Sequence, residues 1–346
     1  MSQPIRTAIV GYGLAGRVFH APFIAADPEF SLDVVVTADA TRAALTEREH
    51  PGVTVVPDFA AVIDRATDLD LVVVATPPVA HFAQAAAALR ADLAVVVDKP
   101  FVLDTREGED LTEIAGAAGR PIAVYQNRRW DGDFLTVRDL IERGALGDVH
   151  QFESAFEYWG PADGTRWHEL TPPSQGGGVT YDLGSHLIDQ ALVLFGPVAS
   201  THADLRTVRP GTANDDVSFV ELIHTSGVRS HLRMNRLAGQ PAARFRVLGS
   251  LGAYVSEVLD GQEAALASGM SPSDERYGMT PAVRWGRLGV TGVDGGPVAV
   301  ETRRGDYPAF YSAMADAVRG RGAVPVTAEE ALEVTRILEQ IRRGAR

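Results

Sequence analysis

The glycine-rich segment at residues 11–16 limits the fold of this chain more than any other feature. An apolar run at residues 7–10 precedes it, and helix-like sequence at residues 17–26 follows it. A G-x-G-x-x-G segment in that context is typical of a strand–turn–helix unit whose backbone faces the pyrophosphate of a dinucleotide. The alternative is a purely structural glycine turn. We expect nucleotide contacts from Gly11, Tyr12, Gly13, Leu14, Ala15 and Gly16.

Strand-like and helix-like segments alternate after this loop as far as residue 124. The strand-like runs are rich in valine, and they lie at residues 32–37, 53–56, 69–76, 95–97 and 121–125. Alternation of this kind favours a doubly wound parallel sheet in an α/β fold. We therefore predict a dinucleotide-binding domain over residues 1–124.

The pattern changes in the remaining part, residues 125–346. From Val149 the apolar residues recur with period two, and several strand-like runs follow without helices between them. This favours an α+β domain with a large open, mostly antiparallel sheet. Residues 268–296 are predicted to form an irregular loop. Thr327 and Glu330 form a predicted capping box for the last helix, which could pack back on the N-terminal domain.

The composition excludes several classes of partner. A net charge of −13 and a pI of about 5.1 argue against nucleic acid or an anionic membrane surface. The sequence has no cysteine, so a thiolate zinc site is excluded, and no other metal site is predicted. The chain has neither an apolar leader nor an uninterrupted apolar stretch of about 20 residues. A cytoplasmic protein without membrane spans is therefore expected.

Two predicted strands end in chemically informative residues. Lys99 follows the buried run at 95–97, at the edge of a parallel sheet where ligands bind, and Pro100 keeps it out of a helix. The alternative is an ordinary surface lysine. Asp39 follows the second strand, where an acid would bond ribose hydroxyls and favour NAD. Arg42 lies nearby, and Asp39 could equally be an exposed turn residue, so NAD and NADP both stay open.

A second polar constellation follows the glycines at 176–178. The apolar spacing becomes helical from about Thr180, which predicts that Asp182 and His186 share one helix face. A carboxylate beside an imidazole can orient it for proton transfer. The alternative is an acid that complements the helix dipole and a histidine of the core.

These motifs together resemble the glucose–fructose oxidoreductase/inositol dehydrogenase/rhizopine-catabolism (Gfo/Idh/MocA) family. The residues that carry the resemblance are Gly11 to Gly16, Thr76-Pro77-Pro78 with His81, Asp98-Lys99-Pro100, and Gly177-Gly178 with Asp182, Gly184 and His186. The chain is most similar to the branch that includes NADP-dependent scyllo-inositol dehydrogenases. Two residues depart from the family pattern: Asp98 replaces the usual glutamate, and Asp39 stands where NADP-using members tend to have arginine.

The resemblance implies a Rossmann domain and reversible hydride transfer between NAD or NADP and a secondary alcohol of a sugar or cyclitol. It implies cofactor contacts from Thr76, Pro77, His81 and Lys99, and it makes Lys99, Asp182 and His186 the catalytic residues. It also implies a cis Lys99–Pro100 bond and a homodimer or homotetramer formed through the open sheet. An NAD-dependent glycosidase and a non-enzymatic dinucleotide-binding regulator stay open as alternatives. Because a polyol needs polar donors and an aromatic wall, further substrate contacts are predicted from Asn127, Arg128, Arg129, Trp159, Arg166 and Trp167.

Overall fold

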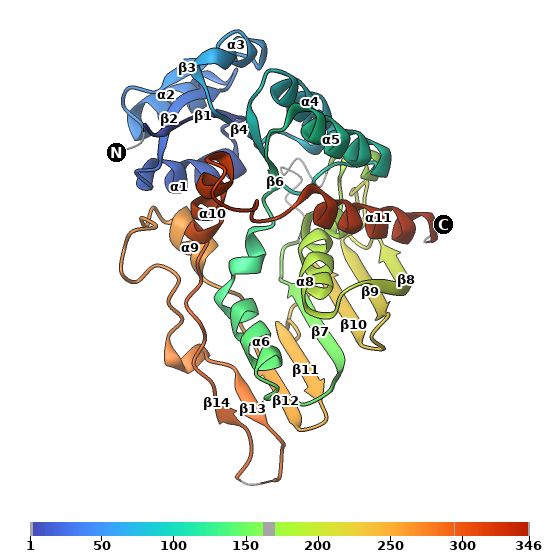
Figure 1. Cartoon of the computed structure of the whole chain (residues 1–346). Helices are drawn as coiled ribbons and strands as arrows, with labels where there is room; N and C mark the ends of the chain where they lie inside the picture. The colour runs from blue at the N-terminus through green and yellow to red at the C-terminus, as the bar shows by residue number, and fades with distance from the viewer. Residues whose placement is uncertain (1–2, 162–169, 294, 345–346) are drawn as a thin grey trace. The chain divides into compact units, whose positions relative to one another are not determined.

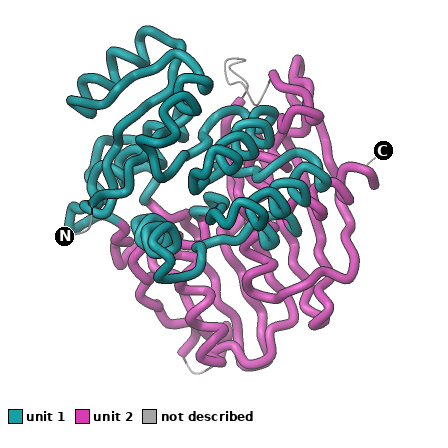
Figure 2. Tube along the Cα trace, turned by 45° about the horizontal axis from the view of Figure 1, so that its top comes forward, with its two compact units in different colours: residues 1–127, 262–277, 307–333 teal, residues 128–261, 278–306, 334–346 magenta. Residues whose placement is uncertain are grey.

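The structure is a computed structural model that describes residues 3–161, 170–293 and 295–344. The chain divides into two compact units, which Figure 2 distinguishes by colour. Unit 1 comprises residues 1–127, 262–277 and 307–333. Unit 2 comprises residues 128–261, 278–306 and 334–346. Each unit has its own sheet.

The sheet of unit 1 is six-stranded and entirely parallel, with the order β3-β2-β1-β4-β5-β6 (Figure 1). This order reverses between β1 and β4, which is the arrangement of dinucleotide-binding α/β folds. The middle strands β4 and β5 are buried on both faces, which explains their unbroken apolar sequence. The strands are β1 (Ile5–Val10), β2 (Phe30–Val36), β3 (Thr54–Val56), β4 (Leu71–Val74), β5 (Ala94–Val97) and β6 (Ile122–Val124).

Helices join these strands and complete unit 1. Asp104 begins α5 by accepting from the backbone N–H groups of Arg106 and Glu107, and Gly119 ends the helix with a φ of 61°. The helical segments are η1 (Ala15–His20), α1 (Ala21–Ala26), α2 (Ala40–Glu49), α3 (Ala60–Ile63), η2 (Ala66–Asp68), η3 (Pro78–Ala80), α4 (His81–Arg90), α5 (Thr105–Ala118), α9 (Gln262–Ala267) and α10 (Pro308–Val318).

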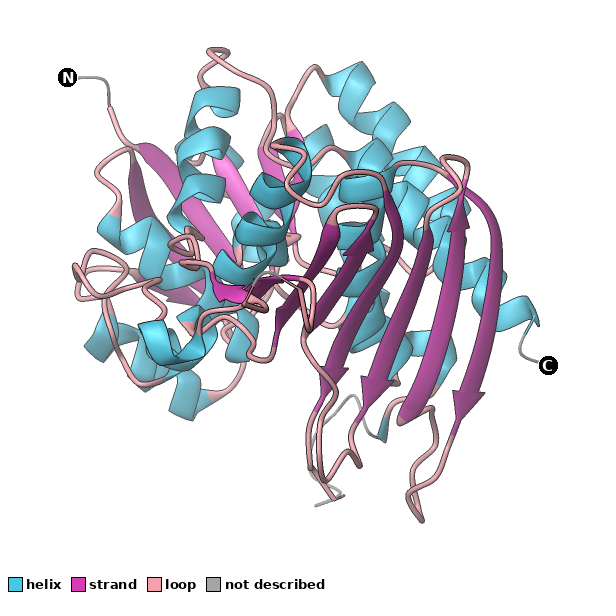
Figure 3. Cartoon of the chain, turned by 90° about the horizontal axis from the view of Figure 1, so that it is seen from below, coloured by secondary structure: helices cyan, strands magenta, loops and turns pink. Residues whose placement is uncertain are grey.

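The sheet of unit 2 is eight-stranded, and Figure 3 shows its long strands side by side. Its order is β14-β13-β12-β11-β7-β10-β9-β8, and the pair β7–β10 is parallel while the other pairs are antiparallel. The predicted mostly antiparallel sheet is therefore confirmed. Its strands are β7 (Val149–Glu157), β8 (Val198–Arg206), β9 (Val217–His224), β10 (Arg229–Asn235), β11 (Phe245–Gly249), β12 (Gly252–Ser256), β13 (Arg287–Gly289) and β14 (Val298–Ala299).

One face of this sheet is covered and the other is polar. Helix α8 (Ser185–Phe195) packs on β7 and β10, and α6 (Gly132–Glu142) brings Phe134 against Phe245 of β11. The period-two burial of β9 and β10 follows from this one-sided cover. The remaining short helical segments are η4 (Asn127–Trp130), η5 (Pro173–Gln175), η6 (Thr180–Gly184) and η7 (Ala282–Arg284).

Helix α11 (Ala328–Gly344) begins at the predicted capping box. Thr327 Oγ1 accepts from the N–H of Glu330 at 3.1 Å, and a Glu330 carboxylate oxygen accepts from the N–H of Thr327 at 2.9 Å. Its first turn belongs to unit 1, where Leu332 lies against Gly108 of α5. Within the described residues, no helix combines the length and the apolar character that a membrane span requires.

Candidate functional site

The glycine loop joins β1 to η1 and fits a phosphate cradle. Gly11 has a φ of 97°, and a Cβ there would lie 2.6 Å from the carbonyl oxygen of Ala75. A Cβ at Gly16 would lie 2.0 Å from the carbonyl oxygen of Gly11. A Cβ at Gly13, in contrast, would meet no described atom within 4 Å. Gly11 and Gly16 are therefore required by the turn itself, whereas Gly13 leaves open space over the backbone, which is where a pyrophosphate needs close approach.

Tyr12 supports this loop from the inside. Its side chain is buried, and its hydroxyl donates to Glu49 Oε2 at 3.0 Å. Burial, together with Glu49, raises the pKa of the Tyr12 phenol above its ordinary value. Glu49 is also paired with Arg17 of η1 at 2.6 Å. The three side chains connect the loop, η1 and the end of α2, while Leu14 is exposed.

Asp39 lies after β2 and caps α2. Its Oδ1 accepts from the N–H of Arg42 at 2.9 Å, so the carboxylate has a structural role as well as the predicted ribose contact. The exposed position leaves the other oxygen accessible to solvent.

The loops that follow β4 and β5 are joined by His81. This buried ring places Nε2 2.9 Å from the carbonyl oxygen of Thr76, and Nδ1 3.0 Å from that of Pro100. Thr76 itself donates its hydroxyl hydrogen to Gln84 at 2.7 Å, and Pro77 is exposed at the loop surface. His81 therefore acts as a clamp between the two predicted cofactor loops, in addition to any contact with a ligand.

Lys99 lies at the carboxyl end of β5, on the edge of the sheet that carries the glycine loop. The Lys99–Pro100 bond is cis, as the family resemblance predicts. The backbone N–H of Lys99 donates to Asp98 Oδ1 at 2.7 Å. Lys99 is also the only lysine in the sequence, where all the other residues of the Lys and Arg total of 32 are arginine. The Asp98-Lys99-Pro100 motif by itself does not reveal that the chain has a single lysine.

In unit 2 the glycines at 177 and 178 allow close approach of backbone to Asp215. A Cβ at Gly177 would lie 1.7 Å from the carbonyl oxygen of Thr171, and one at Gly178 would lie 2.2 Å from Asp215 Oδ1. Asp215 accepts from the N–H of Thr180 at 2.9 Å and from Arg342 at 2.7 Å. Asp215 and Arg342 thus fix the start of the Asp182 segment, although neither stands in a recognisable motif.

Asp182 and His186 lie on two different kinds of helix. Residues 180–184 form a π-helical segment, so the prediction of α-helical spacing from Thr180 is wrong for this turn, and regular α-helix begins at Ser185. Asp182 forms an ion pair with Arg236 at 3.0 Å, and the Arg236 side chain is 3% exposed. His186 is buried in the first turn of α8. Arg236 is a residue that sequence reading missed, because it follows β10 without a motif.

Several predicted substrate contacts have structural partners. Arg128 is buried, with its guanidinium 5.1 Å from the Phe156 ring centroid. Arg129 forms a two-bond pair with Asp189, at 2.7 and 2.8 Å. Asn127 is buried at the start of η4, whereas Trp159 is 63% exposed. Arg166 and Trp167 lie outside the described residues.

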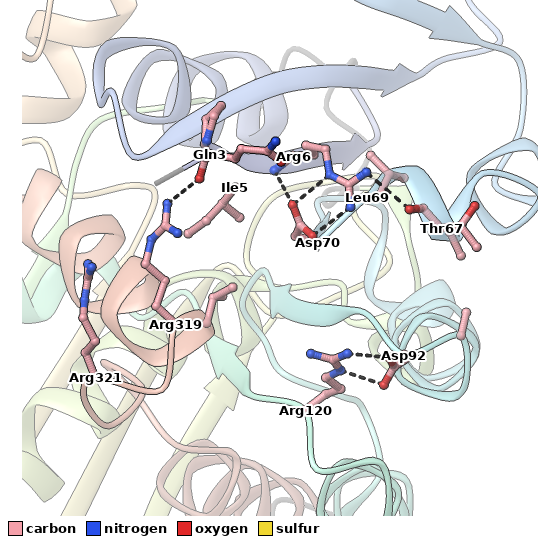
Figure 4. Close-up of a pocket in the computed structure, with 14 residues that line it drawn as sticks. Gln3, Ile5, Arg6, Thr67, Leu69, Asp70, Asp92, Arg120, Arg319 and Arg321 are labelled. Atoms are coloured by element: carbon pink, nitrogen blue, oxygen red, sulfur yellow. Dashed lines mark hydrogen bonds and ion pairs between the residues drawn. The ribbon is translucent and has the colours of Figure 1, made fainter. Parts of the chain in front are cut away.

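A pocket lies at the opposite edge of the unit 1 sheet (Figure 4). Its walls come from residues that precede or begin β1, β4, β5 and β6, and from the end of α10 with the residues after it. Arg6 pairs there with Asp70 at 2.9 Å, Arg120 pairs with Asp92, and Arg319 pairs with Glu29 at 2.8 Å. Ligands of parallel sheets bind at the carboxyl ends of the strands. This pocket is therefore distinct from the glycine loop and Lys99.

Comparison with known proteins agrees with this arrangement. Residues 5–126 match the oxidoreductase family with an NAD-binding Rossmann fold, and residues 134–255 match the GFO/IDH/MocA C-terminal domain. The uncharacterized oxidoreductase YdgJ of Escherichia coli K12 is 40% identical over 342 residues, which cover 98% of this chain and 96% of that protein.

Two relatives from Bacillus subtilis extend the comparison. The scyllo-inositol 2-dehydrogenase (NADP(+)) IolW of strain 168 is 32% identical over 336 residues, which cover 97% of this chain and 92% of that protein. A solved structure of yvaA from Bacillus subtilis has a TM-score of 0.93 at 31% identity, and the match covers 100% of this chain and 97% of that one. The resemblance predicted from the motifs is confirmed, and the chain belongs to the Gfo/Idh/MocA family of NAD-binding oxidoreductases.

Proposed function

We propose that this protein is a dehydrogenase that transfers a hydride between NAD or NADP and a secondary alcohol of a sugar or cyclitol. The observation that carries the proposal is the placement of the only lysine of the chain directly after β5, on the sheet edge that carries the glycine loop. Everywhere else that a lysine or arginine stands, the chain uses arginine. A guanidinium cannot lose its proton near neutral pH, whereas an amine can. The use of lysine at position 99 alone supports a role there for a cation that can exchange a proton.

The glycine loop suits a dinucleotide. Gly11 and Gly16 pack tightly against neighbouring backbone, whereas the space beside the Cα of Gly13 is empty and can admit a phosphate group. A bound nicotinamide would supply the hydride acceptor or donor. Asp39 favours NAD, since its carboxylate would repel a 2′-phosphate, whereas the name of IolW specifies NADP(+). The two nucleotides are compared directly in the assay below.

Lys99 is assigned the proton transfer to and from the substrate oxygen, and its ammonium stabilises negative charge on that oxygen. Asp182 and His186 are assigned to the substrate hydroxyls and to the same proton transfer, with Arg236 holding the Asp182 carboxylate. Asn127, Arg128, Trp159 and Trp167 are further proposed substrate contacts. The name of IolW supports the cyclitol class, because it belongs to a relative that aligns over most of the chain.

The test is a 340 nm absorbance assay with NAD and NADP offered separately, and with a panel of inositols, aldoses and sugar acids. We expect turnover by the wild-type protein and a loss of roughly a hundredfold or more in both Lys99→Ala and Lys99→Arg. Lys99→Arg is the informative variant, since it keeps the positive charge and removes the exchangeable proton. Nucleotide binding and the melting temperature should change little in Lys99→Arg.

Other results would point elsewhere. Tight nucleotide binding without turnover on any substrate would favour a regulator, and sugar release without net NADH formation would favour a glycosidase. Full activity in Lys99→Arg would contradict the assignment of proton transfer to Lys99.

The same proposal includes a homodimer or homotetramer formed through the open face of the unit 2 sheet. That face carries charged pairs, among them Arg233 with Glu153 and Arg229 with Glu221. An interface of this polarity should weaken with salt. Sedimentation velocity at low and high salt would measure it, and a monomer under both conditions would contradict the assembly.

A further inference from the structure

A row of three side chains, two of them buried and the third, Asp98, 15% exposed, lies behind Lys99 in unit 1. His20 ends the π-helical segment η1, Tyr311 lies in α10, and Asp98 immediately precedes Lys99. His20 and Tyr311 are 0% and 1% exposed. The His20 ring also packs on Tyr125, with the ring centroids 4.4 Å apart. Three elements distant in sequence thus meet at the strand end that carries the lysine.

A short hydrogen bond joins Tyr311 to His20. The Tyr311 hydroxyl lies 2.6 Å from His20 Nδ1. Burial, aided by the charge of Asp98, raises the pKa of the Tyr311 phenol well above its ordinary value, so the phenol stays protonated. When the phenol donates to Nδ1, the ring proton lies on Nε2.

His20 Nε2 faces Asp98. The nitrogen lies 3.9 Å from Asp98 Oδ2 and is buried, with no hydrogen-bond partner among the described residues. The other oxygen of Asp98 accepts from the N–H of Lys99 at 2.7 Å. Burial alone would raise the pKa of the Asp98 carboxyl, but His20, followed by Lys99 and His81, lowers it below its ordinary value. The carboxylate is thus ionised between the His20 ring and the Lys99 backbone.

We propose that Tyr311 and His20 form a positioning arm that fixes the Asp98 carboxylate and thereby controls the orientation and charge of Lys99. The inference rests on the proposed role of Lys99 in proton transfer. A carboxylate held toward His20 attracts the Lys99 ammonium less than one that is free to rotate. Without the Nε2 donor, Asp98 would stabilise the ammonium more strongly. The other titratable groups at this point are His81 and the phenols of Tyr125 and Tyr311.

The test compares two substitutions of His20, each of which replaces a different ring nitrogen with an amide nitrogen. His20→Gln can place an amide donor near the position of Nε2, whereas His20→Asn reaches only as far as Nδ1. Protein labelled with ¹³C-lysine gives a single lysine side-chain spin system, because Lys99 has no counterpart in the sequence. Its titration by NMR therefore measures the pKa of Lys99 in the full chain without substrate.

We expect the Lys99 signal to titrate at higher pH in His20→Asn than in the wild type. We also expect it to lower kcat about tenfold, since small errors in the placement of a reacting group are costly. His20→Gln should stay within about threefold of the wild type. Tyr311→Phe should change the pKa in the same direction as His20→Asn, because it frees the tautomer of His20. Tyr277→Phe is the matched control, since Tyr277 is buried against Phe23 of the same unit.

Two results would overturn the arm. One is a Lys99 pKa and kcat in His20→Asn equal to those of the wild type in a protein with an unchanged melting temperature. The other is the same change in His20→Asn, His20→Gln and Tyr277→Phe, which would indicate general loosening of the core. If the wild-type protein oxidises no alcohol, the proposed function fails, yet the NMR titration still tests the arm.

Discussion

At the scale of single residues, the sequence indicates which side chains can carry chemistry, but it does not show which atoms those side chains pack against. The glycine motif was recognisable because three glycines at fixed spacing precede a helix. Their separate roles were not, since these depend on the carbonyls of Ala75 and Gly11 in the folded loop. Asp215 and Arg236 were missed for a related reason. A single acid or arginine at a strand end becomes informative only when its partner across the fold is known.

The glycines predict two different outcomes for the same substitution. Gly13→Ala adds a Cβ to open space, so the melting temperature should stay unchanged while nucleotide affinity falls more than tenfold, about 1.4 kcal/mol. Gly16→Ala places a Cβ against the Gly11 carbonyl and should destabilise the fold by about 1–3 kcal/mol. Denaturant unfolding and nucleotide titration on both variants would check this. Equal nucleotide affinity in Gly13→Ala and the wild type would contradict the cradle.

At the scale of elements, the two predicted site segments share an irregularity. Ala15–His20 and Thr180–Gly184 are both π-helical, and each passes directly into an α-helix. Such segments are frequent at functional sites. The apolar periodicity predicted helix in both places but not its type, because a single wider turn hardly changes the pattern over a short segment. The outcome is a different direction for Asp182 relative to His186 than an α-helical turn would give.

The ion pair between Arg129 and Asp189 should contribute strongly to holding η4 against α8. Their side chains are 11% and 2% exposed, so Arg129→Ala removes two charge-assisted hydrogen bonds from a buried carboxylate and should cost about 3–5 kcal/mol. Arg138→Ala is the matched control, because Arg138 pairs with Glu142 on an exposed helix surface and should cost less than about 1 kcal/mol. Urea unfolding would measure both. Equal losses in the two variants would show that burial does not govern the Arg129 pair.

At the scale of the whole molecule, the sequence predicted fold class better than register. Unbroken valine runs identified the buried parallel strands, and the period-two apolar pattern identified the one-sided sheet, whose strands β9 and β10 are buried with the same period. The parallel pairing of β7 with β10 was not predictable, since the apolar pattern of a strand carries no information on the direction of its neighbour. The short helical segment η7 and strand β13 interrupt residues 268–296, which were expected to be irregular throughout, because a run as short as β13, flanked by glycines, gives little strand signal.

Buried carboxylates of this molecule should also shape how its stability depends on pH. Asp133 in α6 is 2% exposed and lies 3.3 Å from Arg244. Burial, together with Asp260, outweighs Arg244 and raises the pKa of Asp133 to about 6. The unfolded chain releases this proton near pH 3.9. Between these two values the folded state binds more protons, so the contribution of Asp133 to stability falls as the pH rises from about 4 to about 6 and is constant above that range.

Asp133→Asn isolates this effect, because an asparagine resembles the protonated acid and does not titrate. The stability of the wild-type protein minus that of the variant should fall by about 1–3 kcal/mol between pH 4 and pH 6. Carboxylates whose pKa is lowered, such as Asp70 beside Arg6, act in the opposite direction, but their contribution cancels in the difference. Unfolding by urea at half-unit pH intervals would give the curve. A difference that rises with pH over this range would mean that Arg244 keeps Asp133 ionised, and that the pair acts as an ordinary buried salt bridge.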